Sequence, residues 1–121
     1  MTITVPVMTP QNFSIPAGYN EVITFDVDPA VTPSLVGTTI WWRVYEQQFG
    51  IPLIGATPLI IKSTPAIIAL DSPLSFQVPL LTHDTIGLLR NYYHEASILD
   101  VTDEVIGGSF GIMTVTETQN R

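Results

Sequence analysis

The chain has 121 residues and no cysteine, and its formal net charge is −7 because eleven acidic side chains face only four basic ones. The length fits one domain with a core that needs no covalent staples, and the absence of cysteine excludes disulfides and thiolate metal sites. The charge argues against a nucleic-acid partner, since phosphate binding requires clustered cations, and no apolar run reaches the roughly 18 residues of a membrane helix.

The first twenty residues are apolar, uncharged as far as Pro16, and rich in proline. Thr2–Met8 alternates like a strand but is interrupted by Pro6, which fits an edge strand or an extended arm. Thr9–Asn20 is predicted to be a loop. The segment has no basic region and is therefore not a signal peptide. Because a disordered tail is normally polar, we expect residues 1–20 to form an extended arm that either docks on another protein or completes its own sheet.

Residues 21–118 show the alternation of apolar and polar positions that predicts β-strands. The expected strands are Glu21–Val27, Thr38–Glu46, Leu59–Ser63, Ala66–Leu70, Leu74–Leu80, Tyr92–Leu99 and Val105–Thr116. Gln47–Pro58 is an excursion more apolar than a solvated loop. One helical turn is predicted at Asp84–Leu89, capped by the side chain of Thr82. This order of short strands predicts an all-β, antiparallel sandwich over residues 21–118.

A predicted hairpin and one further strand carry the clearest β-strand patterns. Tyr92–Leu99 and Val105–Thr116 are expected to form a long hairpin, closed by a turn at Asp100–Asp103 and bent by a bulge at Gly107-Gly108. Thr38–Glu46 places Trp41 and Trp42 on opposite faces of one strand. One tryptophan should anchor the core, and the other should lie on a neighbouring surface.

The two histidines are the first candidates for chemistry. Neither has the spacing of a metal ligand with partners. His83 and Asp84 could form an acid–base pair, but a polar turn at the start of a short helix is the favoured interpretation. His94 lies in a strand and is predicted to be a core or interface histidine.

Clustered carboxylates are the second candidates. Asp26 with Asp28, and Asp100 with Asp103 and Glu104, could hold calcium, although solvated turn carboxylates are the favoured interpretation. No nucleophile can be placed beside a base, and no phosphate-loop pattern is present. We therefore predict a protein that is not an enzyme and that holds no cofactor and no metal.

The order of motifs resembles a structural module of tailed phages. The residues that carry the resemblance are Asp84-Thr85-x-x-Leu88, Tyr92-x-His94, Ile98-x-Asp100 and Val105-Ile106-x-Gly108-x-Phe110, preceded by Leu35-Val-Gly-Thr-Thr-Ile-Trp-Trp-Arg-Val. The module is similar to the N-terminal domain of phage baseplate upper proteins and to head and fibre decoration domains. Asn91 stands where the module has glycine, and His94 replaces its second aromatic residue. Over residues 35–118 the resemblance implies an immunoglobulin-like sandwich without catalytic residues.

The resemblance implies a bacteriophage virion protein made in the host cytoplasm. A single module with an apolar arm favours a capsid-decorating (cement) protein that binds the major capsid protein and stabilises the head shell. We expect a homo-oligomer, with a trimer favoured, and neither nucleic acid nor membrane as a partner. The predicted partner contacts are Ile3, Val5, Val7 and Phe13 in the arm, Leu53 and Ile54 in the excursion, and Trp41.

Two other functions remain open. The first is a tail, neck or baseplate adaptor, which would form a ring instead of covering a lattice. The second is a carbohydrate-binding sandwich in which Trp41, Tyr45, Tyr92 or Tyr93 stacks on sugar rings. Exposed aromatic side chains gathered on one flat face would favour this second alternative.

Overall fold

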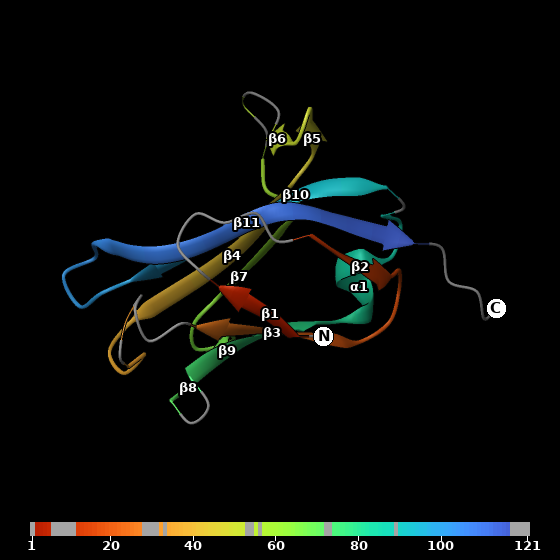
Figure 1. Cartoon of the computed structure of the whole chain (residues 1–121). Helices are drawn as coiled ribbons and strands as arrows, with labels where there is room; N and C mark the ends of the chain where they lie inside the picture. The colour runs from red at the N-terminus through yellow and green to blue at the C-terminus, as the bar shows by residue number, and fades with distance from the viewer. Residues whose placement is uncertain are drawn as a thin grey trace.

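The computed structural model describes residues 2–5, 12–27, 32, 34–52, 55, 57–71, 74–88 and 90–116, and within β1 it describes the backbone alone. In these residues the chain forms eleven β-strands and one helix of four residues (Figure 1). The expectation of an all-β chain with one short helical turn is confirmed.

The larger sheet has five strands and curls along its length (Figure 1). In spatial order its strands are β2 (Phe13–Pro16), β11 (Val105–Thr116), β10 (Asn91–Leu99), β4 (Thr39–Tyr45) and β7 (Ile60–Ser63). The hairpin of β10 and β11 is the predicted one and runs the whole width of the molecule in Figure 1. Every functional surface described below lies on this sheet or at an edge of the two main sheets.

The second sheet has four strands, in the order β1 (Thr2–Val5), β3 (Glu21–Val27), β9 (Leu74–Leu80) and β8 (Ile68–Asp71). A separate small hairpin pairs β5 (Gln47–Gln48) with β6 (Ile51–Pro52) and projects away from both sheets (Figure 1). The helix α1 (Thr82–Thr85) follows β9 directly.

The expectation of a purely antiparallel architecture was wrong, because both main sheets are mixed. β1 pairs in parallel with β3, and β2 pairs in parallel with β11. Parallel neighbours need a long crossover between them. Residues 6–20 provide it for β1 and β3, because the chain leaves the four-stranded sheet, adds β2 to the five-stranded sheet and then returns.

The prediction that Thr9–Asn20 is a loop was wrong for β2. Phe13 and Ile15 are buried, whereas Ser14 is exposed, so this short run alternates as a half-buried strand does. Pro16 closes the strand at its end, where a missing N–H costs no ladder hydrogen bond. Pro16 therefore marks the end of a strand and does not belong to a loop.

The core is built by alternate residues of both sheets, and one cluster of buried apolar side chains spans them. Phe25 of β3 stacks on Phe76 of β9, with ring centroids 4.8 Å apart and planes 11° apart. Trp42 of β4 is fully buried, and Trp41 on the opposite face is only partly buried. The strict alternation of β4 thus decides which tryptophan anchors the core.

Two local expectations need adjustment. The helix α1 spans Thr82–Thr85 and not the predicted Asp84–Leu89, so Thr82 lies inside it and Leu81 is its N-cap residue. The Leu81 amide donates a hydrogen bond to Asp84 Oδ2 at 2.7 Å. The bulge in the β10–β11 ladder lies at Ile106, because Ile98 pairs with Gly107 and Leu99 pairs with Val105. It therefore adjoins the predicted Gly107-Gly108 position. A Cβ atom on Gly108 would lie 2.5 Å from the Ala96 carbonyl oxygen, so this position requires glycine.

Candidate functional site

The candidates for acid–base or metal chemistry lie apart in the structure. His83 is exposed, with its Nε2 atom 3.5 Å from Asp84 Oδ1, so these neighbours in sequence do face each other. Asp84 nevertheless forms a salt bridge with Lys62, whose Nζ atom lies 2.8 Å from Asp84 Oδ2. No group of three or more His, Cys, Asp or Glu side chains that could hold a metal occurs among the described residues.

His94 is a core histidine, as predicted. It is fully buried, and its Nδ1 atom accepts a hydrogen bond from Trp42 Nε1 at 3.3 Å. The ring of Phe13 packs edge-on against it, with centroids 4.8 Å apart. The position therefore joins β2, β4 and β10 and lies inside the protein, away from the surface where a substrate would bind.

In the acidic turn after β10, the Asp100 carboxylate forms hydrogen bonds within the turn. Asp100 Oδ1 accepts hydrogen bonds from the Thr102 amide at 2.8 Å, from the Thr102 hydroxyl at 2.7 Å and from the Glu104 amide at 3.1 Å. The Thr102 hydroxyl and these two amides lower the pKa of Asp100 below its usual value. The predicted turn chemistry is confirmed for Asp100. Of the other carboxylate pair, Asp28 lies outside the described residues.

The outer face of the five-stranded sheet gathers aromatic side chains, and we call it the aromatic face. The strand register places Trp41, Arg43 and Tyr45 of β4 beside Ser97, Glu95 and Tyr93 of β10. On the other side of β10, Phe110 pairs with Glu95 and Ile112 pairs with Tyr93. All these side chains are half-buried, so they form a continuous surface and do not project singly into solvent.

The rings on the aromatic face contact one another. Tyr93 lies between Tyr45 and Phe110, with both centroids 6.4 Å from its own. The guanidinium carbon of Arg43 lies 4.1 Å from the ring centroid of Trp41, within cation–π range. Of the four aromatic residues expected for sugar stacking, Trp41, Tyr45 and Tyr93 are together, whereas Tyr92 is buried on the core side.

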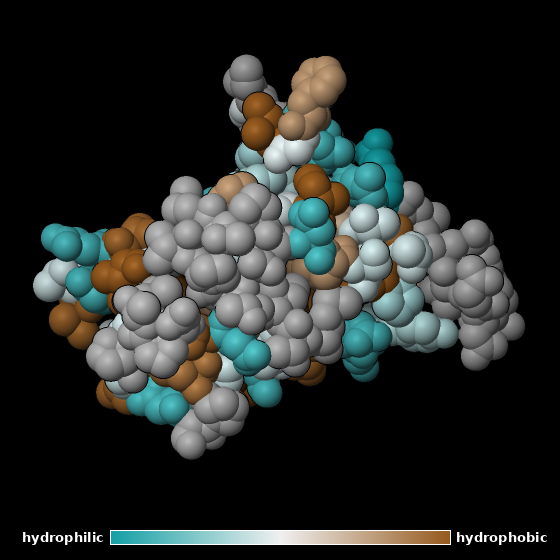
Figure 2. All heavy atoms as spheres, viewed as in Figure 1, coloured by the Kyte–Doolittle hydropathy of each residue, from teal (hydrophilic) through white to brown (hydrophobic). Residues whose placement is uncertain are grey.

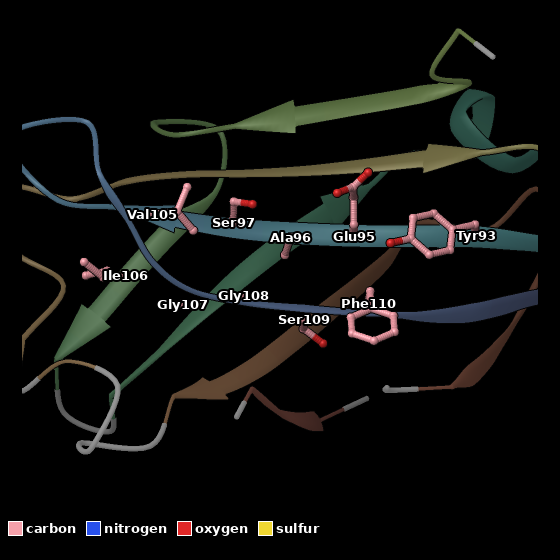
Figure 3. A pocket seen from close by; sticks show the side chains of 10 residues that line it. All are labelled: Tyr93, Glu95, Ala96, Ser97, Val105, Ile106, Gly107, Gly108, Ser109 and Phe110. Carbon is pink, nitrogen blue, oxygen red and sulfur yellow. The ribbon is translucent and has the colours of Figure 1, made fainter. Parts of the chain in front are cut away.

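A hollow of about 370 Å³ opens beside these rings (Figure 3). Val105 and Ile106 lie at one end, and Tyr93 and Phe110 lie at the other. Gly107 and Gly108 lie between them and carry no side chain to fill the space (Figure 3). Glu95 and Ser97 of β10 also line it. We call this hollow the glycine pocket.

Glu95 is the charged side chain that lines the glycine pocket, and Arg43 lies beside it across the β4–β10 pair. Glu95 makes no hydrogen bond or ion pair with any described residue, and burial raises the pKa of its carboxyl although the Arg43 charge opposes the effect. Arg43 Nε is buried and has no hydrogen-bond partner among the described residues. Burial also raises the pKa of Tyr93, helped by Glu95 and Tyr45. Unsatisfied polar groups of this kind cost stability and call for an explanation.

A second candidate surface is apolar and lies at the edges of both sheets. β7 and β8 are the last strands of their sheets and are joined by only Thr64–Ile67. Together with the β5–β6 hairpin, this apolar edge exposes six large hydrophobic side chains: Phe49, Ile51, Leu59, Ile61, Ile68 and Leu70. Figure 2 shows hydrophobic residues on the projecting hairpin at the top of the view.

The predicted partner contacts are distributed unevenly. Phe13 packs in the core of its own chain, and Trp41 lies on the aromatic face. Ile3 and Val5 belong to β1, opposite Phe25 and Val27 of β3, and the structure does not describe their side chains. Val7, Leu53 and Ile54 lie outside the described residues.

Sequence reasoning missed Phe110 as a member of the aromatic face. The alternation of β11 assigns Phe110 to a face of the strand. Its contact with Tyr93 depends on the register of the β10–β11 hairpin, which alternation does not give. It also missed Phe49 at the hairpin tip, since no strand was expected on either side of it.

The sequence matches no protein-family model and no curated protein. In the described part of the chain, no helix is long and apolar enough to cross a membrane.

Proposed function

We propose that this chain is a non-enzymatic structural protein of a bacteriophage virion, which decorates the head by binding the major capsid protein. We further propose that its fold is an immunoglobulin-like sandwich. Two β-sheets that share one core support this fold, and the motif order between residues 35 and 118 supports the phage assignment. The observation that carries the function is the apolar edge.

The apolar edge exposes large hydrophobic side chains on β7, on β8 and on the projecting hairpin. Phe49 is 92% exposed, and Ile61 and Ile68 are 60% and 52% exposed. Large exposed apolar surfaces mark sites of protein–protein contact. In solution these side chains carry an unfavourable free energy of hydration, whereas in an assembly they are buried against a neighbour.

The edge strands also lack the charges that normally prevent strand addition. β7 carries one charge, Lys62, and its ammonium group is bound to Asp84 at 2.8 Å. β8 carries one charge, Asp71, whose carboxylate accepts hydrogen bonds from the Ser34 hydroxyl at 2.6 Å and the Leu35 amide at 2.9 Å. Both charges are therefore held by contacts within the chain. Because β7 and β8 end their sheets in the described residues, a neighbouring strand can add at either edge.

Immunogold electron microscopy of virions from the phage that encodes this chain tests the proposal. Antibody raised against the chain should label the head in a regular array. Labelling confined to the tail or neck would overturn head decoration in favour of an adaptor ring, and particles without label would overturn the virion assignment altogether.

A matched pair of variants tests the apolar edge itself. Ile68→Lys places a charge on β8, and Val101→Lys makes the same charge change at an exposed turn residue that is not one of the six side chains of the apolar edge. We expect Ile68→Lys to lose binding to purified heads in a cosedimentation assay and Val101→Lys to keep it. Equal binding by the two variants would contradict the role of the edge.

A further inference from the structure

We propose that the glycine pocket and the aromatic face beside it bind a neutral saccharide, with Tyr93 and Phe110 against the sugar ring and Glu95 accepting hydrogen bonds from its hydroxyls. This inference goes beyond the proposed function, because it concerns a different face of the molecule from the apolar edge.

The size and shape of the pocket suit a small ligand. Its volume of about 370 Å³ falls within the range of roughly 300–1,000 Å³ that small-molecule sites occupy. The floor is bare because Gly107 and Gly108 have no side chains, and the Cβ contact at Gly108 means that a larger residue cannot replace it without moving the backbone. The pocket is therefore held open by the local backbone.

The rings provide the apolar part of the site. Tyr93 and Phe110 lie with planes 29° apart and centroids 6.4 Å apart, and Tyr45 continues the row. The faces of aromatic rings are electron-rich, and the C–H bonds on one face of a pyranose ring are slightly positive. A sugar ring that lies on Tyr93 or Phe110 therefore gains both contact area and an electrostatic attraction.

The polar groups select the chemistry of the ligand. Glu95 lines the pocket and offers a carboxylate acceptor, and Arg43 faces it across the β4–β10 pair, where its charge opposes the effect of burial on the pKa of Glu95. A cationic ligand would satisfy Glu95 but would be repelled by Arg43, and an anionic ligand would meet the opposite difficulty. A neutral, polyhydroxylated ligand donates hydrogen bonds to Glu95 without adding a charge beside Arg43, so a saccharide fits this balance of charges.

A printed array of bacterial and eukaryotic glycans, probed with the full chain, tests the proposal. The strongest array glycan is then titrated by tryptophan fluorescence, because Trp41 lies on the same face. Tyr93→Ala should weaken its affinity about threefold to tenfold, and Glu95→Gln about tenfold, because a charged acceptor is lost while the shape is kept.

Tyr19→Ala is the matched control, since Tyr19 is an exposed tyrosine that does not line the pocket. It should change the affinity less than about twofold. A silent array would overturn the proposal, and so would an affinity unchanged in both pocket variants. The Ile68→Lys variant should bind the same glycan as the native chain does, so that failure of the edge and failure of the pocket are distinguishable.

Discussion

At the scale of single residues, His94 makes the clearest prediction, because it is the hydrogen-bond acceptor for the buried Trp42 indole N–H. His94→Phe restores an aromatic ring but leaves that N–H without this acceptor. An unsatisfied buried donor costs about 1–3 kcal/mol, so urea unfolding should show a loss of that size. His83→Phe, at an exposed histidine, is the control and should stay within about 0.5 kcal/mol. Equal stability of the two variants would contradict the proposed role of the hydrogen bond.

Adjacent positions on β11 should respond in opposite directions to alanine. Gly108→Ala forces a Cβ atom to within 2.5 Å of the Ala96 carbonyl oxygen, and overpacking of this kind costs about 1–3 kcal/mol. Ser109→Ala removes a buried hydroxyl that has no partner among the described residues, so it should leave the free energy of unfolding unchanged or raise it. Thermal and urea unfolding of both variants provide the measurement, and a stable Gly108→Ala protein would contradict the close approach.

The tip of the β5–β6 hairpin combines strain with exposure. Phe49 and Gly50 form its two-residue turn with φ angles of 57° and 81°, and a bulky residue in this left-handed region is strained. Because the Phe49 side chain is 92% exposed, it gains no packing in return. Phe49→Asn creates the favoured Asn-Gly turn and should raise the free energy of unfolding by about 1 kcal/mol.

The same substitution should weaken particle binding if the phenylalanine is retained for contact with a partner. A variant that is more stable and still binds heads with full affinity would place the contact elsewhere on the apolar edge.

At the scale of elements, Asp84 links α1 to β7 and gives the fold a defined pH dependence. Burial alone would raise the pKa of Asp84, but hydrogen bonds from Lys62 and the Leu81 amide, with the nearby positive charges, lower it below 3.8. A carboxyl whose pKa is lowered by folding stabilises the protein above its unfolded pKa, and this contribution is lost as the pH falls through the folded value.

Asp84→Asn should therefore cost about 1 kcal/mol at pH 7 from the lost ion pair with Lys62, because the asparagine oxygen still accepts the hydrogen bond from the Leu81 amide. The difference from the native chain should shrink once the pH drops below about 4. Urea titrations across this range measure it. A difference that is constant with pH would show that Asp84 acts through shape and not through charge.

The elements that the sequence predicted well are those with an unambiguous period of two. Glu21–Val27 and Leu74–Leu80 have the predicted bounds, because apolar residues recur at every second position along them. Val105–Thr116 also has the predicted bounds, although Gly107, Gly108 and Ser109 interrupt its alternation. β2 was missed because a strand of four residues that ends at a proline is too short to show a period. β5 and β6 were missed because their turn, Phe49–Gly50, lacks the usual Asn-Gly or Asp-Gly signal.

At the scale of the whole molecule, the sheet arrangement and the candidate sites depended on pairings that alternation cannot supply. The parallel entry of β1 and β2 follows from a crossover between sheets, and local pattern carries no information about it. Three of the aromatic residues on the outer face were named from sequence, but their meeting with Phe110 and Glu95 depends on the register of three strands. Tyr92 was expected among them because the sequence does not show which face of its strand points to the core, and the structure places it on the core side.

The open edges lead to a prediction about assembly. β7 and β8 end the two sheets and are separated by four residues, so a neighbour that covers one strand also lies near the other. A stable interface needs roughly 800 Å² from each partner, and Ile61, Ile68 and Leu70 are the exposed hydrophobic side chains that β7 and β8 contribute to it.

Light scattering over a micromolar concentration range should therefore give the mass of a trimer for the native chain and of a monomer for Ile68→Lys, with Val101→Lys remaining trimeric. The lysine must be desolvated if it enters such an interface, whereas on a free monomer it is solvated without cost. A native chain that stays monomeric would contradict self-assembly and would assign the apolar edge to a different virion protein. A hexamer or dodecamer would favour a neck or tail ring over a head lattice.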